Sequence, residues 1–137
     1  MYPAEIVIPM KHELTDNGFT ELLNTNDVEN VIKKEGTALV VINSVCGCSA
    51  GTARPGVLMA VNEASKKPNV LATSFAGFDV EAVNTIRKHL LPYPPSSPSI
   101  ALFKDGNLVH FIERHNIEGR SAQMIAKNLE SAFEEHC

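Results

Sequence analysis

An apolar run that ends beside two closely spaced cysteines is the feature that most restricts how this chain can fold. Residues 38–42 read Ala-Leu-Val-Val-Ile, a composition typical of a buried strand. Cys46-Gly47-Cys48 follows, and residues 57–61 then have the apolar pattern of a helix. The thiols therefore lie where a strand passes into a helix, whose unpaired N–H groups and partial positive charge stabilise a thiolate.

Length, charge and cysteine number limit the class of protein. A chain of 137 residues suits one domain, 1–137, and its 44% hydrophobic content is ordinary for a soluble globular protein. The net charge of −4 argues against nucleic-acid partners and against a polybasic membrane patch. We expect no membrane span and no secretory signal. Three cysteines form a poor disulfide framework, so we expect a reducing, cytoplasmic setting.

Hydrophobic periodicity predicts the helices. Phe19, Leu22 and Leu23 fit one helical face, and Asn26 with Glu29 resembles a capping box that opens a helix. Pro9 argues against a long strand over residues 6–10. Further helices are expected from the cysteine loop to about residue 65, after the cap Asp79, and after Ser121.

Strands are predicted over 38–43, 70–75, 99–104 and 108–112, with Asp105-Gly106-Asn107 as the turn of a hairpin. A β-α-β unit followed by an antiparallel hairpin and a closing helix describes an α/β fold of the thioredoxin-like sandwich type. It has a central mixed sheet flanked by helices, with additional N-terminal helices. The dithiol then lies at the carboxyl end of the first long strand, and the residues before the hairpin pass beside it.

Short strings at these places resemble the bacilliredoxin family, and the similarity extends over nearly the whole chain. They are Asn43 to Cys48, Ala53-Arg54-Pro55, Ser96 to Ser99, His110-Phe111-Ile112 and Arg114-His115. The resemblance implies a thioredoxin-like thiol–disulfide oxidoreductase of bacteria that use bacillithiol. Such an enzyme removes this low-molecular-weight thiol from bacillithiolated client proteins, with bacillithiol as co-substrate and no cofactor.

Cys46 is the candidate nucleophile, because it lies closest to the strand end and the following N–H groups can point at its sulfur. Cys48 is the nearest thiol to resolve a mixed disulfide on Cys46, unless another thiol does so directly. Gly47 allows backbone angles that bring the pair together. The small ring is expected to be strained, with a reduction potential less negative than thioredoxin's roughly −270 mV. The alternative is two cysteines without a role.

Other residues have two interpretations each. Pro98 is the candidate cis-proline, with the backbone of Ser97 offered to substrate, or else a proline that stiffens a loop. Arg54 either raises the positive potential and binds the carboxylates of bacillithiol, or is a solvated charge at a helix start. Ser49 and Thr52 either bond the thiolate or act as caps.

The third cysteine and two histidines lie outside this loop. Cys137 is either a third thiol, supplied in trans or to a homodimer partner, or a spare thiol at a frayed end. His110 and His115 are expected to be structural or surface residues.

Three other functions stay open. A strained Cys46/Cys48 pair also suits a general disulfide isomerase. The two thiolates suit soft Cu(I) or zinc ions if Cys137 or a histidine completes the site, although no metal is expected. A redox sensor without turnover is the third alternative.

Overall fold

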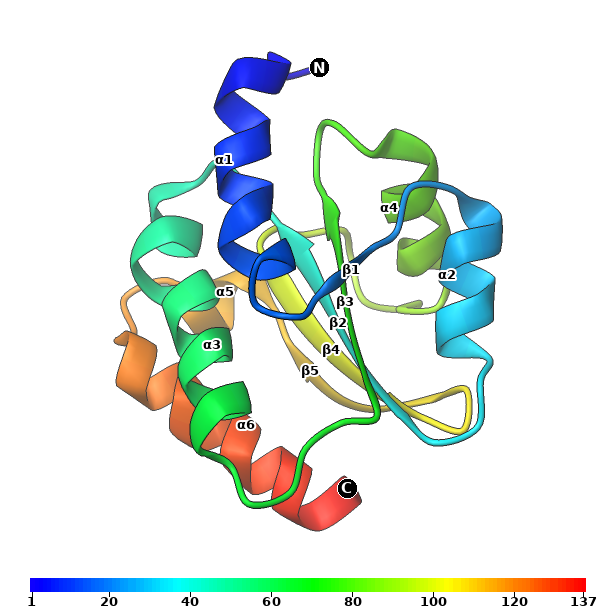
Figure 1. Cartoon of the computed structure of the whole chain (residues 1–137), viewed down its shortest axis with the longest axis vertical. Coiled ribbons are helices and arrows are strands. Elements are labelled where there is room, and N and C mark those ends of the chain that lie inside the picture. Colours follow the sequence, from blue (N-terminus) through cyan, green and yellow to red (C-terminus); the bar gives the residue numbers. More distant parts are fainter.

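Five strands form one mixed sheet in the computed structural model, which describes residues 1–137, and their order is β1-β3-β2-β4-β5 (Figure 1). Parallel pairing joins β3 to both β1 and β2, whereas β4 is antiparallel to β2 and β5 is antiparallel to β4. The strands are β1 (Thr20–Glu21), β2 (Thr37–Asn43), β3 (Val70–Phe75), β4 (Ser99–Lys104) and β5 (Asn107–Ile112).

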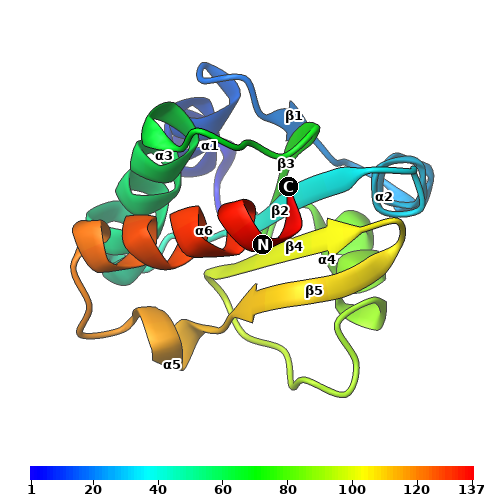
Figure 2. The same ribbon diagram turned by 90° about the horizontal axis from the view of Figure 1, so that it is seen from below.

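Helices cover both faces of this sheet (Figures 1 and 2), as the predicted sandwich requires. Side chains of α1, α3 and α6 form a core against one face, and those of α2 and α4 form a second core against the other. The helices are α1 (Ala4–Thr15), α2 (Thr25–Ile32), α3 (Arg54–Glu63), α4 (Val80–Lys88), α5 (Arg114–Ile117) and α6 (Ala122–His136). None of them has the length and apolar character that crossing a membrane requires.

β2 is the central strand, and all seven of its residues are buried. Successive side chains of a strand point to opposite faces, so Leu39 and Val41 enter the first core while Val40 and Ile42 enter the second. A strand with two apolar faces reads as a continuous hydrophobic run, as predicted. β2 ends at Asn43, where the chain leaves the sheet for the cysteine loop.

Most predicted elements are confirmed in position. β3 and β4 match their predicted ranges, and β5 begins one residue early, at Asn107. The hairpin turn has positive φ at Asp105 and Gly106, the backbone of a tight two-residue connection. Ser121 caps α6 by accepting a hydrogen bond from the N–H of Met124.

The expectations for the N-terminal third are confirmed at one point and wrong at two. Residues 6–10 form no strand, as expected, and lie inside α1 with Pro9 within the helix. The helical interpretation of Phe19, Leu22 and Leu23 is wrong, because Phe19 and Leu22 enter opposite cores, as residues flanking a short strand can. The cap of α2 is Asn24 rather than Asn26, since the Asn24 side chain accepts from the N–H of Asp27.

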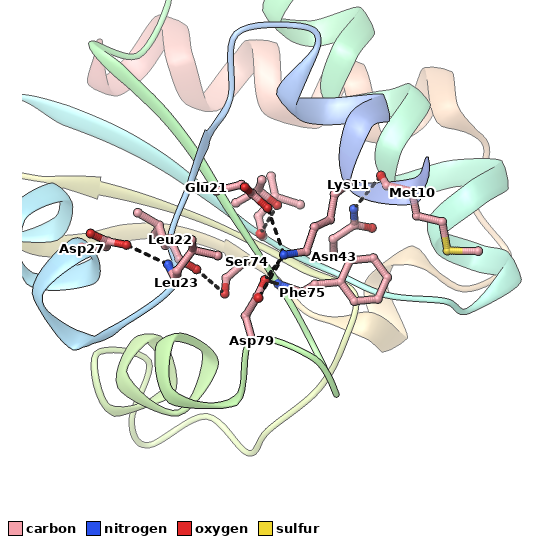
Figure 3. Close-up of polar contacts among 12 residues, drawn as sticks. Met10, Lys11, Glu21, Leu22, Leu23, Asp27, Asn43, Ser74, Phe75 and Asp79 are labelled. Carbon is pink, nitrogen blue, oxygen red and sulfur yellow. Dashed lines mark hydrogen bonds and ion pairs between the residues drawn. The ribbon is translucent and has the colours of Figure 1, made fainter. Parts of the chain in front are cut away.

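A buried lysine fastens α1 to the sheet (Figure 3). Lys11 Nζ lies 2.9 Å from Oε1 of Glu21 in β1 and 2.9 Å from the carboxylate of Asp79, which precedes α4. Burial opposes the ammonium charge, but hydrogen bonds to Asp79 and Glu21 outweigh it and raise the pKa of Lys11. Asp79 also accepts from the N–H of Phe75, so its carboxylate joins segments instead of capping α4. This network joins α1 to β1 and to the segment between β3 and α4.

Candidate active site

The cysteine loop begins at Asn43, the last residue of β2, and ends in a short π-helical turn, Ser49–Ala53, that continues into α3. Cys46 and Cys48 are both free, half-buried thiols in this loop. They therefore lie at the carboxyl end of the central strand, as predicted.

Asn43 and Arg54 hold this loop in shape. The Asn43 side-chain oxygen accepts hydrogen bonds from the Ser44 N–H at 2.8 Å, the Ser49 hydroxyl at 3.0 Å and Arg54 Nη1 at 2.9 Å. On its other side the Asn43 amide donates to the carbonyl of Met10 in α1 at 3.2 Å (Figure 3). The position of the loop therefore depends on α1, and so on the Lys11 network.

Arg54 is neither a solvated charge nor placed to bind a substrate carboxylate, because its side chain is buried and its Nε and Nη1 bond residues of the protein. The residue is 1% exposed. Its Nη1 also donates to the carbonyl of Ser44 at 2.9 Å and to the Ser49 hydroxyl at 3.1 Å, and its Nε donates to Glu13 at 3.0 Å. A guanidinium enclosed in this way cannot reach a substrate, so Arg54 is a structural residue.

The hydroxyls of Ser49 and Thr52 do not serve the thiolate. Ser49 is bonded to Asn43 and Arg54, and Thr52 donates to the carbonyl of Arg120 at 3.0 Å. Thr52 therefore joins the π-helical turn to the segment before α6.

The environment of Cys46 favours its thiolate. A hydrogen bond from the Cys48 thiol lowers the pKa of Cys46 most, against the opposing effect of burial. The backbone N–H of Cys48, 3.4 Å from Cys46 Sγ, and the charge of Arg114 act in the same direction. The predicted N–H groups at the sulfur are thus present.

Cys48 has the opposite behaviour. Its burial raises the pKa of Cys48, and the hydrogen bond to Cys46 and the negative charge of the Cys46 sulfur raise it further. Glu118 adds to this effect. One thiol of the pair is therefore set to ionise while the other keeps its proton.

Arg114 is the site residue that sequence reasoning missed. Its Nη2 lies 3.3 Å from Cys46 Sγ, its Nη1 donates to the carbonyl of Ser97 at 3.2 Å, and its Nε bonds Glu118 at 3.2 Å. It begins α5, a four-residue helix that we did not predict. The reciprocal side-chain bonds of Glu113 and Asn116 form a capping box there, and their spacing is the signal that could have revealed the helix.

The peptide bond between Ser97 and Pro98 is cis, as predicted for this position, and a second cis bond joins Leu91 to Pro92. Arg114 bonds both the Ser97 carbonyl and Cys46, so the proline loop and the dithiol meet through one side chain. Gly47 has no positive φ, and a Cβ there would meet no atom within 4 Å. The dithiol form therefore does not require glycine at this position.

The remaining candidates lie apart from this centre. His110 bonds the side chain of Asn128 at 2.6 Å, and His115 is exposed near Glu113. Cys137 is exposed at the end of α6, and Figure 1 places this terminus at the opposite end of the molecule from the carboxyl end of β2. No group of three or more His, Cys, Asp or Glu side chains is arranged to hold a metal ion.

Solved structures share this architecture. Mitochondrial thioredoxin 3 of Saccharomyces cerevisiae matches with a TM-score of 0.60 at 18% identity, over 90% of this chain and 98% of the yeast chain. Thioredoxin of Fasciola hepatica also matches with a TM-score of 0.60 at 18% identity, over 87% of this chain and 100% of the other. These identities show the fold alone. A thioredoxin fold with a dithiol after its central strand β2 and a cis-proline just before the neighbouring strand β4 defines a thiol–disulfide oxidoreductase.

Sequence comparison names the family. Residues 2–137 match the family model described as disulphide isomerase. A bacilliredoxin of Cytophaga hutchinsonii is 62% identical over 98% of this chain and 99% of its own length, and one of Halalkalibacterium halodurans is 50% identical over 99% and 94%. The chain belongs to the bacilliredoxin family, as the motifs indicated.

Proposed function

We infer that this enzyme removes bacillithiol from bacillithiolated client proteins, with Cys46 as nucleophile and Cys48 as resolving thiol. The observation that carries the proposal is the set of donors around Cys46 Sγ, with Arg114 Nη2 at 3.3 Å and the Cys48 N–H at 3.4 Å. The directions of the two pKa values agree with it, lowered at Cys46 and raised at Cys48. A nucleophile must be a thiolate, whereas a resolving thiol that stays protonated does not compete with it. The bacterial relatives named bacilliredoxins support bacillithiol as the thiol. The cytoplasm is the location that we propose, because two free thiols at the site suit a reducing compartment.

The first step is an exchange at the mixed disulfide. The Cys46 thiolate attacks the bacillithiol sulfur, the bond between that sulfur and the client breaks, and the client leaves as a thiolate. A Cys46–bacillithiol disulfide is formed. Gly47 contributes no side chain to block this approach. We propose that the backbone of Ser97, before the cis-Pro98, receives the backbone of the client.

The second step uses a change in charge. Once Cys46 is in a disulfide, it no longer carries the negative charge that raises the pKa of Cys48. Cys48 then ionises more readily and attacks Cys46 Sγ, which releases bacillithiol as a thiolate and closes the Cys46–Cys48 disulfide. No cofactor takes part, and a cellular thiol reductant must reopen the disulfide.

The test uses a reporter protein with one cysteine carried as its bacillithiol adduct. We expect Cys46→Ser to abolish removal of the adduct, and Cys48→Ser, loaded with bacillithiol disulfide, to accumulate one bacillithiol on Cys46, read by intact mass. The matched control is Cys137→Ser, whose exposed thiol lies at the opposite end of the molecule from the carboxyl end of β2. Removal at the wild-type rate by Cys46→Ser would refute the assignment.

A second function is disulfide isomerisation, which the description of the matching family favours. It also needs the Cys46 thiolate, but its substrate is a wrongly paired protein. Scrambled ribonuclease distinguishes the two: regained ribonuclease activity together with no removal of bacillithiol would establish the isomerase. A role of Cys137 in a homodimer stays a prediction, tested by non-reducing electrophoresis.

A further inference from the structure

The guanidinium of Arg114 is held beside Cys46 by contacts that do not involve the sulfur. Its Nη1 bonds the carbonyl of Ser97, and its Nε bonds the carboxylate of Glu118. The Arg114 side chain is 43% exposed, so it also faces solvent at the site. These two contacts do not depend on the charge of Cys46, so they are available in both states of that thiol.

The first exchange removes the partner of one Arg114 nitrogen. In the dithiol form Nη2 donates to Cys46 Sγ at 3.3 Å. After the attack, the negative charge has left with the client sulfur, and Sγ is one half of a neutral disulfide. Nη2 then has two N–H donors and no anionic acceptor, next to the sulfur to which the small thiol is attached.

A carboxylate on that small thiol supplies the missing acceptor. A guanidinium N–H and a carboxylate oxygen form a charge-assisted hydrogen bond, and a neutral or cationic thiol has no carboxylate to accept it. We propose that Arg114 binds a carboxylate of the thiol attached to Cys46, so that the enzyme selects anionic low-molecular-weight thiols over neutral and cationic ones. This inference rests on the proposed function, since it concerns the adduct formed there.

Of the two arginines close to the dithiol, only Arg114 has a guanidinium free to bind a carboxylate. Arg54 is nearer in sequence, but it is enclosed by the loop. Glu118 is a competing anion on the same guanidinium, bonded through Nε. The negative charge of Glu118 reduces the preference of the enzyme for anionic thiols. Glu118→Gln should therefore increase that preference.

The test uses three thiols of similar size that differ in charge: 3-mercaptopropionate, 2-mercaptoethanol and cysteamine. Each is attached to the cysteine of the same reporter protein, beside the bacillithiol adduct, and the rate constant of removal is measured. We compare the ratio of mercaptopropionate to cysteamine rates between enzymes. Both the intrinsic reactivity of each adduct and any general loss of Cys46 nucleophilicity cancel in that comparison.

We expect Arg114→Gln to lower this ratio about fivefold at low salt, Arg114→Lys to lower it less, and Glu118→Gln to raise it. The matched control is Arg120→Gln, a nearby exposed arginine that should leave the ratio unchanged. Salt should reduce the wild-type ratio. An unchanged ratio in Arg114→Gln, or an equal fall in Arg120→Gln, would overturn the proposal while removal itself continues. Failure of the wild type to remove any adduct would instead overturn the proposed function.

Discussion

Replacing Arg54 with methionine separates a structural role from a catalytic one. Methionine keeps much of the length of the side chain and removes the guanidinium. The carbonyl of Ser44 loses its Arg54 donor, and the Asn43 oxygen keeps two of its three donors. Both residues are buried, so water cannot easily replace the lost donor.

The size of the effect follows from these contacts. A buried polar group left without its partner costs about 1–3 kcal/mol. Arg54 Nη1 donates to three buried acceptors, the Asn43 oxygen, the Ser44 carbonyl and the Ser49 hydroxyl, and only the carbonyl is left without a partner, so we expect a loss of about 3 kcal/mol in the free energy of unfolding. The bond to Glu13 adds little, because the Glu13 side chain is 47% exposed. For a chain of 137 residues the entropy of unfolding is about 0.3 kcal/mol/K, so the melting temperature should fall by about 10 °C.

Thermal unfolding of the reduced protein, followed by circular dichroism, measures this change. Arg114→Met is the matched control, because its exposed guanidinium should affect the melting temperature by about 2 °C or less. We expect the two variants to affect different measurements: Arg54→Met lowers the melting temperature, whereas Arg114→Met slows the removal of bacillithiol. If Arg54→Met melted with the wild type yet lost activity while folded, our structural assignment of Arg54 would be refuted.

Three further predictions concern the thiols, a helix contact and the buried lysine. Alkylation of Cys46 by iodoacetamide should reach half of its maximal rate below about pH 8.5, the pKa of free cysteine. Cys48→Ala should move that midpoint to higher pH, because it removes the main hydrogen bond to the Cys46 sulfur. An unchanged midpoint would contradict the assignment of Cys46 as the ionised thiol. Gly56→Ala places a Cβ 2.8 Å from a side chain of α6, so the free energy of unfolding in urea should fall by about 1–3 kcal/mol. Gly51→Ala is the control and should show no comparable loss, because the space there is open. Equal stability of the two variants would contradict this contact between α3 and α6. Lys11→Met should cost about 3 kcal/mol at pH 7 by leaving Asp79 buried without its ammonium partner. The raised pKa of Lys11 means that this contribution is complete below about pH 10.4 and declines as the pH rises through the folded value, so the gap between wild type and Lys11→Met in urea should narrow there; a constant gap would show that charge is not responsible.

Local sequence patterns determined the sheet and the place of the dithiol. The apolar run of β2 predicts a strand buried on both faces, and Asp105-Gly106 predicts the hairpin turn, because backbone preference and side-chain periodicity are properties of neighbouring residues. The cap at Ser121 follows from the same local chemistry. Since β2 leads directly into Cys46, these patterns also locate the reactive thiol.

Only the tertiary structure decided which arginine serves that thiol. Arg54 is eight positions from Cys46 and turns inward to hold the loop, whereas Arg114, 68 positions away, reaches the sulfur. β1 likewise exists because it pairs with β3, and its two residues carry no strand pattern of their own. Hydrophobic periodicity is a property of neighbouring residues. The partner of a guanidinium or of an edge strand is instead the group that packing places within a few ångströms, and packing joins segments that are far apart in sequence.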